Sequence, residues 1–540
     1  MEETENKTEI IIKIYLDVVK EKKRLPTYAD FLDVDISTST IRHHFGNLTK
    51  LHSYIEIEHQ DILSDVIAHE NHLFSSKRFS ELKDDIKKYK RFVITTAISG
   101  KAVFEPFLES IRNYCDKRNA MLLVLPAADI ASRQTKTAWT FDPLLKGDFF
   151  VHKEIQLNNK FFISNIKLSA KQINPTTGLS RIGQRNGSYV FASPKQSLEI
   201  VATSAQKDRS AMALMTTGAI TVPDYNTERY MSERTSYIAE NDHIMGAIIV
   251  EIENNKVFHF RQLQSNSKGE FVDFGKRYFP NGDVKPEEAH FYAGDWHAGN
   301  TEMDVIDALD DMMDEIEIVD FMVGDFFDGN WSNHYDWNQP LKRVKKVIDK
   351  KNDLKEELLI GCMDINRILG KIFGSLVMIK GNHDERLEKW LAQAQYVNDD
   401  VNHYMALDLA KAYLEGKNVL KEAYLSCNRI ESPERIIWLD RDEEFKVAGV
   451  ECGQHGDLGA NGSPGSLLSI EKAYGNCIVG HTHSPAILRG VYRVGTFSKL
   501  QLDYNRGPSS WMHTGCLIYN DGSRQLINFI NGGSYRLKDD

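Results

Sequence analysis

Five short polar clusters in the second half of this 540-residue chain each follow an apolar run of strand length, and each contains glycine. Between the first two clusters, apolar residues recur at helical spacing, so the order strand, loop, helix, strand predicts a β-α-β progression. Ligands in such sheets gather at the carboxyl ends of the strands, and we expect the clusters to converge on one rim. They occupy residues 294–297, 324–329, 381–384, 453–457 and 480–483, after apolar runs at 289–293, 318–323, 376–379, 447–452 and 477–479.

The clusters contain carboxylate, amide and imidazole donors but no cysteine that could act as a ligand. Mixed donors of this kind suit manganese, iron or zinc and disfavour copper or iron–sulfur sites. One ion takes about four to six donors, so the set divides over two ions about 3.5–4 Å apart that share a carboxylate. Two such ions can clamp a phosphate and activate a water molecule for attack on phosphorus. The candidate ligands are Asp295, His297, Asp325, Asn382, His455, His481 and His483.

The order D-x-H, G-D-x-x-D, G-N-H-D, H, G-H-x-H resembles the calcineurin-like metallophosphoesterase superfamily over roughly residues 288–535. The resemblance implies an α/β fold, a two-sheet sandwich flanked by helices, with a dinuclear centre. Asp325 would bridge the two ions. The remaining donors would be Asp295, His297 and His483 for one ion, and Asn382, His455 and His481 for the other.

The same resemblance implies roles for residues beside the ligands. His383 would protonate the leaving oxygen, Asp384 would orient the His383 imidazole, and Asp328 would support the site. A helical insertion is expected at 391–425, between the third and fourth clusters. It contains His403, a rival of His455 that lacks the setting of a strand followed by glycine.

The N-terminal 75 residues predict a separate helical domain with the order of a helix-turn-helix. The stretch 37–47 resembles the recognition helix of tetracycline-repressor-type regulators, which points to Arg42, His43 and His44 as DNA contacts. Trihelical units also serve in packing and oligomerisation. Residues 1–70 contain 8 Lys/Arg against 14 Asp/Glu, and this acidic balance favours assembly into a homo-oligomer.

Residues 90–285 predict a strand-rich α/β domain without a chemical motif, followed by the phosphoesterase domain at 286–540. A strand at 91–97, a helix at 103–117 and a strand at 120–125 form one β-α-β unit. No apolar run approaches the ~18 residues that cross a bilayer. The cysteines form no C-x-x-C pair, which fits a reducing cytoplasm and no membrane partner.

Protein phosphatases, nucleotide phosphodiesterases and SbcD-type DNA nucleases share these ligands. The helix-turn-helix-like segment and an aromatic loop at 331–337, on which bases can stack, favour a nuclease. A local basic stretch also favours it in a chain of net charge −11. This stretch consists of Lys342, Arg343, Lys345, Lys346, Lys350 and Lys351, and the first four are the candidate DNA contacts.

The layout of the chain also resembles that of phage early proteins that degrade host DNA. We therefore predict a DNase that uses two divalent ions, most simply Mn²⁺, and that acts in the cytoplasm. The alternative enzyme is a phosphatase or phosphodiesterase acting on a nucleotide or a phosphoprotein. The non-enzymatic alternative, a DNA-binding regulator on a degenerate scaffold, predicts lost ligands, and the sequence retains all of them.

Overall fold

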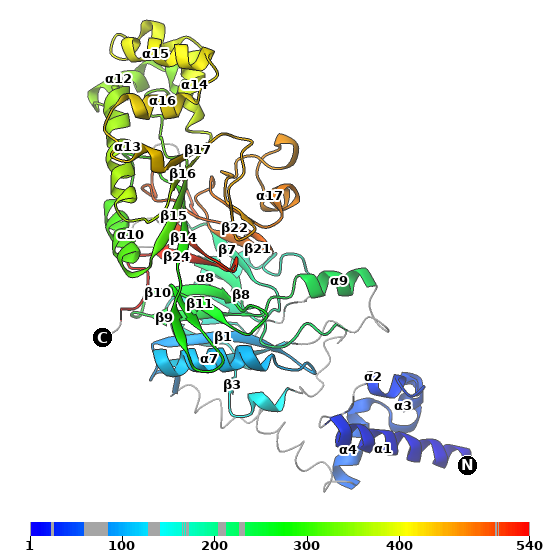
Figure 1. Ribbon diagram of the computed structural model, residues 1–540. Helices are drawn as coiled ribbons and strands as arrows, with labels where there is room; N and C mark the ends of the chain where they lie inside the picture. The colour runs from blue at the N-terminus through cyan, green and yellow to red at the C-terminus, as the bar shows by residue number, and fades with distance from the viewer. Residues whose placement is uncertain are drawn as a thin grey trace.

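The computed structural model describes residues 2–22, 26, 28–58, 85–127, 141–164, 166, 168, 172–203, 212–225, 233–502, 505 and 507–538 (Figure 1). The predicted domain boundary at residue 75 lies outside these residues. Among the described residues, no helix is both long and apolar enough to cross a membrane.

Four helices form the N-terminal unit, as the sequence predicts. They are α1 (Glu2–Lys22), α2 (Tyr28–Leu32), α3 (Thr38–Phe45) and α4 (Leu48–Glu58). Ser37 caps α3 by accepting a hydrogen bond from the Thr40 amide, and Gly46 ends the helix with a positive φ of 79°. The helices pack on a core of their own that is built from Ile11, Tyr15, Val19, Phe31, Ile41, Leu48, Leu51 and Ile55.

A five-stranded sheet with the order β10-β9-β1-β2-β3 follows. Its strands are β1 (Arg91–Ile98), β2 (Ala120–Ala127), β3 (Phe149–Phe150), β9 (Gly246–Ile252) and β10 (Phe258–Gln264). Strands β1 and β2 are parallel and connected by α7 (Glu105–Arg118), which confirms the predicted β-α-β unit. A small antiparallel sheet of β11 (Phe271–Asp273), β12 (Lys276–Tyr278) and β13 (Val284–Pro286) precedes the phosphoesterase region.

The first sheet of that region has the order β17-β16-β15-β14-β23-β24. It contains β14 (Ala289–Asp295), β15 (Ile318–Gly324), β16 (Leu376–Ile379), β17 (Ile436–Leu439), β23 (His513–Tyr519) and β24 (Arg524–Phe529). Strands β14 to β17 are parallel, and α10 (Met303–Glu315) and α13 (Leu354–Leu369) share one apolar core with the sheet. The helical pattern predicts one apolar face for α10, and its members Val305, Ile306, Leu309, Met312 and Met313 are buried, whereas Met303 at the start of the helix is exposed.

The second sheet has ten strands and crosses the predicted boundary at residue 286. Its order is β18-β19-β20-β22-β21-β7-β8-β6-β5-β4. The C-terminal strands are β18 (Lys446–Val447), β19 (Val450–Glu451), β20 (Cys477–Val479), β21 (Ala486–Leu488) and β22 (Val491–Arg493). The others are β4 (Ile155–Asn158), β5 (Phe161–Ile163), β6 (Ser188–Phe191), β7 (Ser197–Val201) and β8 (Met212–Thr216). Pairing of β21 with β7 joins the two sets, so the expected sandwich has a second sheet made from both regions.

Helices gather beyond one end of the six-stranded sheet, at the top of Figure 1. They are α11 (His334–Trp337), α12 (Pro340–Ile348), α14 (Glu385–Ala392), α15 (His403–Leu414) and α16 (Val419–Ser426), and they include the predicted helical insertion. The remaining helices are α8 (Ser180–Asn186), α9 (Glu233–Asn241) and α17 (Leu467–Tyr474). Short 3-10 turns occur at Pro143–Leu145, Gln395–Asn398, Pro433–Arg435 and Ala460–Gly462.

Candidate metal centre

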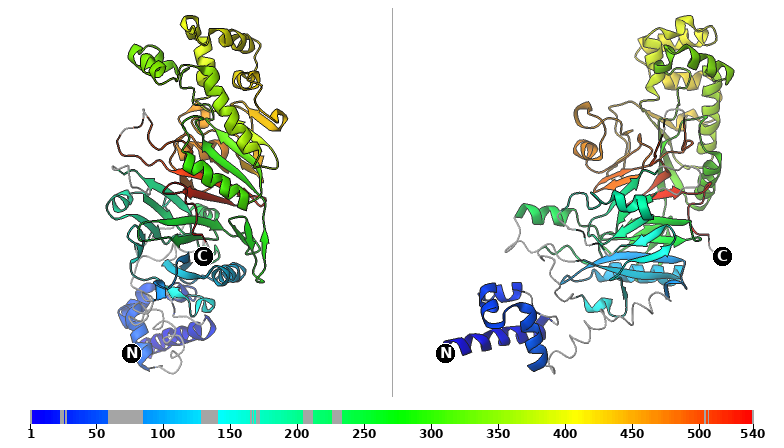
Figure 2. Two further views of the ribbon diagram at one scale, coloured as in Figure 1. Left: turned by 90° about the vertical axis from the view of Figure 1, so that its left-hand side faces the viewer. Right: turned by 180° about the vertical axis from the view of Figure 1, so that it is seen from behind.

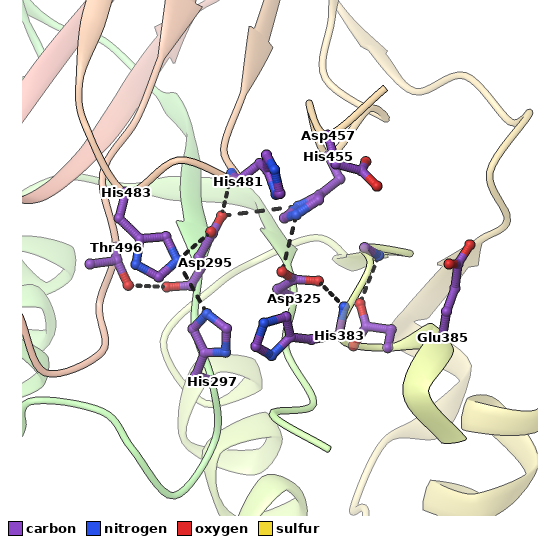
Figure 3. Close-up of polar contacts among 12 residues, drawn as sticks. Asp295, His297, Asp325, His383, Glu385, His455, Asp457, His481, His483 and Thr496 are labelled. Carbon is purple, nitrogen blue, oxygen red and sulfur yellow. Dashed lines mark hydrogen bonds and ion pairs between the residues drawn. The ribbon is translucent and has the colours of Figure 1, made fainter. Parts of the chain in front are cut away.

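The five polar clusters meet between the two sheets of the sandwich (Figure 3). Strand β14 ends at Asp295, and Asp325 directly follows β15. The third cluster follows β16, and the last two follow β19 and β20 of the other sheet. The six-stranded sheet therefore supplies one wall of the site, and the ten-stranded sheet supplies the other.

Two groups of donor atoms correspond to the two predicted ion positions. In each group, one ligand atom per residue lies within 4.8 Å of the others. His483 Nε2 lies 2.7 Å from Asp295 Oδ2, and His455 Nε2 lies 3.1 Å from Asp325 Oδ2. The first group is Asp295, His297 and His483, and the second is Asp325, His455 and His481.

Two glycines let the carboxylates approach the backbone of neighbouring loops. A Cβ atom at Gly381 would overlap Asp325 Oδ1, and one at Gly480 would overlap Asp295 Oδ1. The amide of His383 donates to Asp325 Oδ1 at 2.9 Å, and that of His481 donates to Asp295 Oδ1 at 2.7 Å. Glycine begins these two clusters because a side chain would exclude the carboxylate that holds the loop.

Four of the seven candidate ligands have a backbone in the left-handed region. The φ values are 54° for His297, 41° for Asp325, 73° for His481 and 58° for His483. Non-glycine residues in this region are held at a cost of about 1–3 kcal/mol each and cluster at functional sites. The sharp turns at the strand ends direct these side chains into the space between the sheets (Figure 3).

Carboxylate and imidazole groups in the centre stabilise each other's charged forms. Burial acts to raise the pKa of Asp295, but the neighbouring His483 and His455 imidazoles outweigh it and lower the pKa below its usual value. The pKa of Asp325 is likewise lowered despite burial, mainly by His455 and His383. Burial opposes a charged His455, yet Asp325 and Asp295 raise its pKa to about 10. The two carboxylates are therefore anionic and attract positive charge.

Several buried polar atoms at this rim have no hydrogen-bond partner in the described chain. Buried lone pairs of this kind are costly unless a ligand or an ion satisfies them. Carboxylate, amide and imidazole donors together suit divalent manganese, iron or zinc. The residues therefore fit a dinuclear centre, and Asn382 on the third loop has a buried amide oxygen without a hydrogen-bond partner in the described chain. The atoms without a hydrogen-bond partner are Asn382 Oδ1, His455 Nδ1, His481 Nδ1 and His483 Nδ1. Asp295 Oδ2 and His455 Nε2 have only the imidazole–carboxylate contacts described above.

Comparison with known proteins agrees with this geometry. The family model of the calcineurin-like phosphoesterases matches residues 292–495. Residues 292–495 are therefore similar to the calcineurin-like phosphoesterases. The chain is also 26% identical over 473 residues to Protein A1 of Escherichia phage T5, with 83% of each protein covered.

His383 lies against His297, with ring centroids 4.4 Å apart. The role of Asp384 in orienting His383 stays a prediction, and the Asp384 carboxylate accepts hydrogen bonds from the amides of Gly381 and Phe327. Asp328 contacts the imidazoles of both His383 and His297. Its backbone oxygen lies 3.1 Å from His383 Nδ1, and its carboxylate lies 3.1 Å from His297 Nδ1.

Burial, followed by the charge of Asp325, raises the pKa of Asp384 to about 7. Its hydrogen bonds tie the loop after β15 to the loop after β16. Asp384 therefore connects two ligand loops.

Sequence reasoning missed Arg386, one of the residues closest to the reaction centre. Its guanidinium lies 2.9 Å from His383 Nε2 and donates to the backbone oxygen of Asp328 at 2.7 Å. The side chain crosses Gly329, where a Cβ would meet Arg386 carbons at 3.0 Å. The available signal was a basic residue in the first turn of α14, directly after the G-N-H-D motif. His403 lies elsewhere, at the start of α15, with its Nδ1 3.2 Å from the Tyr396 carbonyl.

Predicted DNA contacts on α12 are already engaged within the chain. Lys342 and Lys346 both pair with Asp336 at 2.9 Å, and Lys345 lies 3.2 Å from Asp349. The Arg343 guanidinium lies over the Trp337 ring, 4.0 Å from its centroid.

The aromatic loop at 331–337 is only partly available for stacking. Trp331 is buried, and its indole N–H donates to Asp399, whereas Tyr335 is 72% exposed. In the N-terminal unit, Arg42 and His43 are exposed on α3, and His44 Nδ1 lies 3.0 Å from the Thr8 hydroxyl. The solvent-facing candidates for base or phosphate contact are therefore fewer than the sequence pattern indicates.

Proposed function

We propose that this chain is a metal-dependent phosphodiesterase that hydrolyses DNA at the centre between the two sheets. The observation that carries the proposal is the pair of donor groups with Asp325 positioned to join them and His383 beside them. A phosphate ester is the substrate that such a pair of divalent ions polarises. Manganese is the ion that we propose, since it accepts mixed oxygen and nitrogen donors.

The ions, when bound, supply a Lewis acid and activate water. The chain holds them through the seven candidate ligands and positions two further groups. His383 Nε2 is the atom that we assign to protonation of the leaving oxygen; it accepts a hydrogen bond from Arg386 in this structure and must take up a proton before it can act. Arg386, next to that nitrogen, offers charged N–H donors to the phosphate oxygens. Asp328 orients the imidazoles of His383 and His297 for these roles.

DNA as the substrate is supported by the N-terminal unit and by the exposed side chains on α3. Arg42 and His43 face solvent at the helix that follows the turn, where a recognition helix meets DNA. The likeness to a phage protein along most of the chain is consistent with a role during infection. We further propose that the acidic N-terminal unit assembles the chain into a homo-oligomer. All six cysteines are free thiols, which suits activity in a reducing cytoplasm.

The first experiment incubates supercoiled and linear DNA with the full chain after chelation by EDTA. We expect no cleavage in the chelated sample and recovery of cleavage with Mn²⁺. Parallel reactions contain p-nitrophenyl phosphate and a phosphopeptide, which represent the alternative substrates. Cleavage of DNA that persists after exhaustive chelation would contradict the dinuclear centre. Hydrolysis of the monoesters alone would replace the DNase assignment with a phosphatase.

A second experiment tests the α3 contacts. The double variant Arg42→Gln/His43→Gln removes exposed side chains, and we expect weaker DNA binding with a shallower salt dependence. Lys13→Gln is the matched control, because Lys13 is an exposed cation on α1 of the same unit. Equal loss in both variants would indicate a general charge effect and would remove the recognition role of α3.

A further inference from the structure

A cavity of about 210 Å³ adjoins the ligand loop 480–483 on the ten-stranded sheet. It lies over β21 and β7, the two strands that join the phosphoesterase strands to those of the preceding region. Neither region alone provides its floor. The polar side chains that line it are Asn174, Glu199, Thr482, Ser484, Arg493 and Ser510.

The floor of the cavity has a charged residue at each end and a small residue between them. Ala486 pairs with Arg493 on one neighbouring strand and with Glu199 on the other. Directly paired residues in antiparallel strands point to the same face of a sheet. The methyl group of Ala486 therefore leaves open space between a guanidinium and a carboxylate. Glu199 is engaged by the Thr176 hydroxyl at 2.8 Å.

Arg493 is a largely buried cation that lacks an acidic partner in contact. Its Nε donates to the Ser484 carbonyl at 2.8 Å, and no described carboxylate lies within salt-bridge distance of it. Burial lowers the pKa of Arg493 to about 10, and Asp295 is the charge that opposes this shift. The side chain is still cationic at neutral pH. Buried cations are normally paired, so the free part of this guanidinium indicates an anionic ligand.

Neutral hydrogen-bonding groups lie on the same wall. The Thr482 hydroxyl is buried without a hydrogen-bond partner in the described chain, and the Ser484 and Ser510 hydroxyls lie 2.6 Å apart. Thr482 stands between His481 and His483, one donor from each ion position. An anion held by Arg493 therefore lies close to the metal centre.

We propose that this cavity binds a second phosphate of a polynucleotide strand, next to the phosphate that the metal centre cleaves. The inference rests on the proposed function, because only a substrate with successive phosphates occupies both positions. Arg493 and the hydroxyls receive the phosphate. Glu199 repels a further phosphate and accepts hydrogen bonds from the sugar or base. The cavity thereby favours a strand over an isolated phosphate ester.

The experiment compares three thymidine dinucleotides with Mn²⁺: d(TpT), d(pTpT) and d(TpTp). All contain the same cleavable bond, and the last two add one phosphate on either side. We expect one of these two to show a kcat/KM at least about tenfold higher than that of d(TpT). Arg493→Gln should bring this ratio close to one, and Arg493→Lys should retain part of it.

Two further variants give the matched controls. Glu199→Gln removes the repulsive charge from the same cavity and should maintain or increase the ratio. Arg489→Gln removes a cation from the same hairpin that pairs with Glu471, and it should leave the ratio at the wild-type value. If Arg493→Gln does not fold, as judged by its melting temperature, Thr482→Val tests the same wall and should reduce the ratio several-fold.

The outcomes separate this inference from the proposed function. Failure of the wild-type protein to cleave any dinucleotide or longer DNA would contradict the proposed function itself. Equal cleavage of all three dinucleotides by the wild type would overturn the second-phosphate site and leave the DNase assignment in place. A ratio that survives in both Arg493→Gln and Thr482→Val would also overturn it.

Discussion

The metal centre and the α12 segment are both dense in charged side chains, but the charges have different partners. At the centre, carboxylate and imidazole groups from five loops lie close to one another, and several buried atoms there have no hydrogen-bond partner in the described chain. On α12, the cations are satisfied by Asp336, Asp349 and the Trp337 ring. Buried polar atoms without a hydrogen-bond partner indicate a ligand, whereas surface cations that already pair with acids of the same chain indicate a structural role.

The difference shows which sequence signals carry functional information. Each cluster at the centre is tied to the end of a strand, so the backbone brings the side chains together. The basic stretch on α12 was identified from its content of lysine and arginine alone. Asp336, six residues before Lys342, forms ion pairs with two of these lysines. The following predictions test this contrast, beginning with the largest expected effect.

Asp325→Asn should abolish most activity, with a loss of at least about 10³-fold, because the shared carboxylate loses its charge and both ion positions weaken. Metal analysis of the purified variant should show less than the wild-type content at both positions. A variant with full metal content and wild-type activity would separate Asp325 from the centre.

His383→Ala should reduce the rate by about 10²–10⁴-fold while the metal content stays at the wild-type level. The reason is that His383 supplies a proton and is not assigned as a strong ligand. The loss should be smaller for a substrate with a good leaving group such as bis(p-nitrophenyl) phosphate. Metal loss in this variant would instead place His383 among the ligands.

Asp328→Asn should mainly affect the reaction rate, whereas Asp384→Asn should mainly affect stability. The first removes the charge beside His297 and His383, so we expect a rate loss of about 10–100-fold with an altered pH profile. The second weakens the tie between two ligand loops, and we expect chiefly a lower melting temperature. A larger change in the pH profile for Asp384→Asn would support the role that the sequence assigned to it.

Lys342→Gln and Lys346→Gln should have the smallest effect on DNA. Both lysines pair with Asp336, so each substitution should cost up to about 1 kcal/mol of local stability and change DNA affinity less than threefold. Lys350→Gln is a matched control for general surface charge. A loss of DNA affinity greater than that of the Arg42→Gln/His43→Gln variant would indicate that α12 contacts DNA.

The sequence alone predicted the convergence of the polar clusters, and the structure brings six of the seven candidate ligands together. Apolar runs of strand length mark where loops begin, and a parallel arrangement brings those loops to a common edge. Glycine at the start of a cluster was an informative signal, because Gly381 and Gly480 are where carboxylates touch the backbone. The N-terminal helices were also predictable from the sequence, because local interactions set the ends of α3. Ser37 caps its start through a hydrogen bond, and Gly46 ends it with a positive φ.

Tertiary structure decided the contacts between side chains that are distant in the sequence. Asp328 and Arg386 both contact the His383 imidazole, and these contacts depend on the path of each loop and the direction of each side chain. The pairing of β7 with β21 created both the ten-stranded sheet and the cavity beside Arg493. The sequence pattern of a strand specifies which of its faces is apolar. It does not specify the neighbouring strand, because the backbone groups at an open sheet edge can pair with any strand of suitable register. Only packing of the complete chain selects that partner.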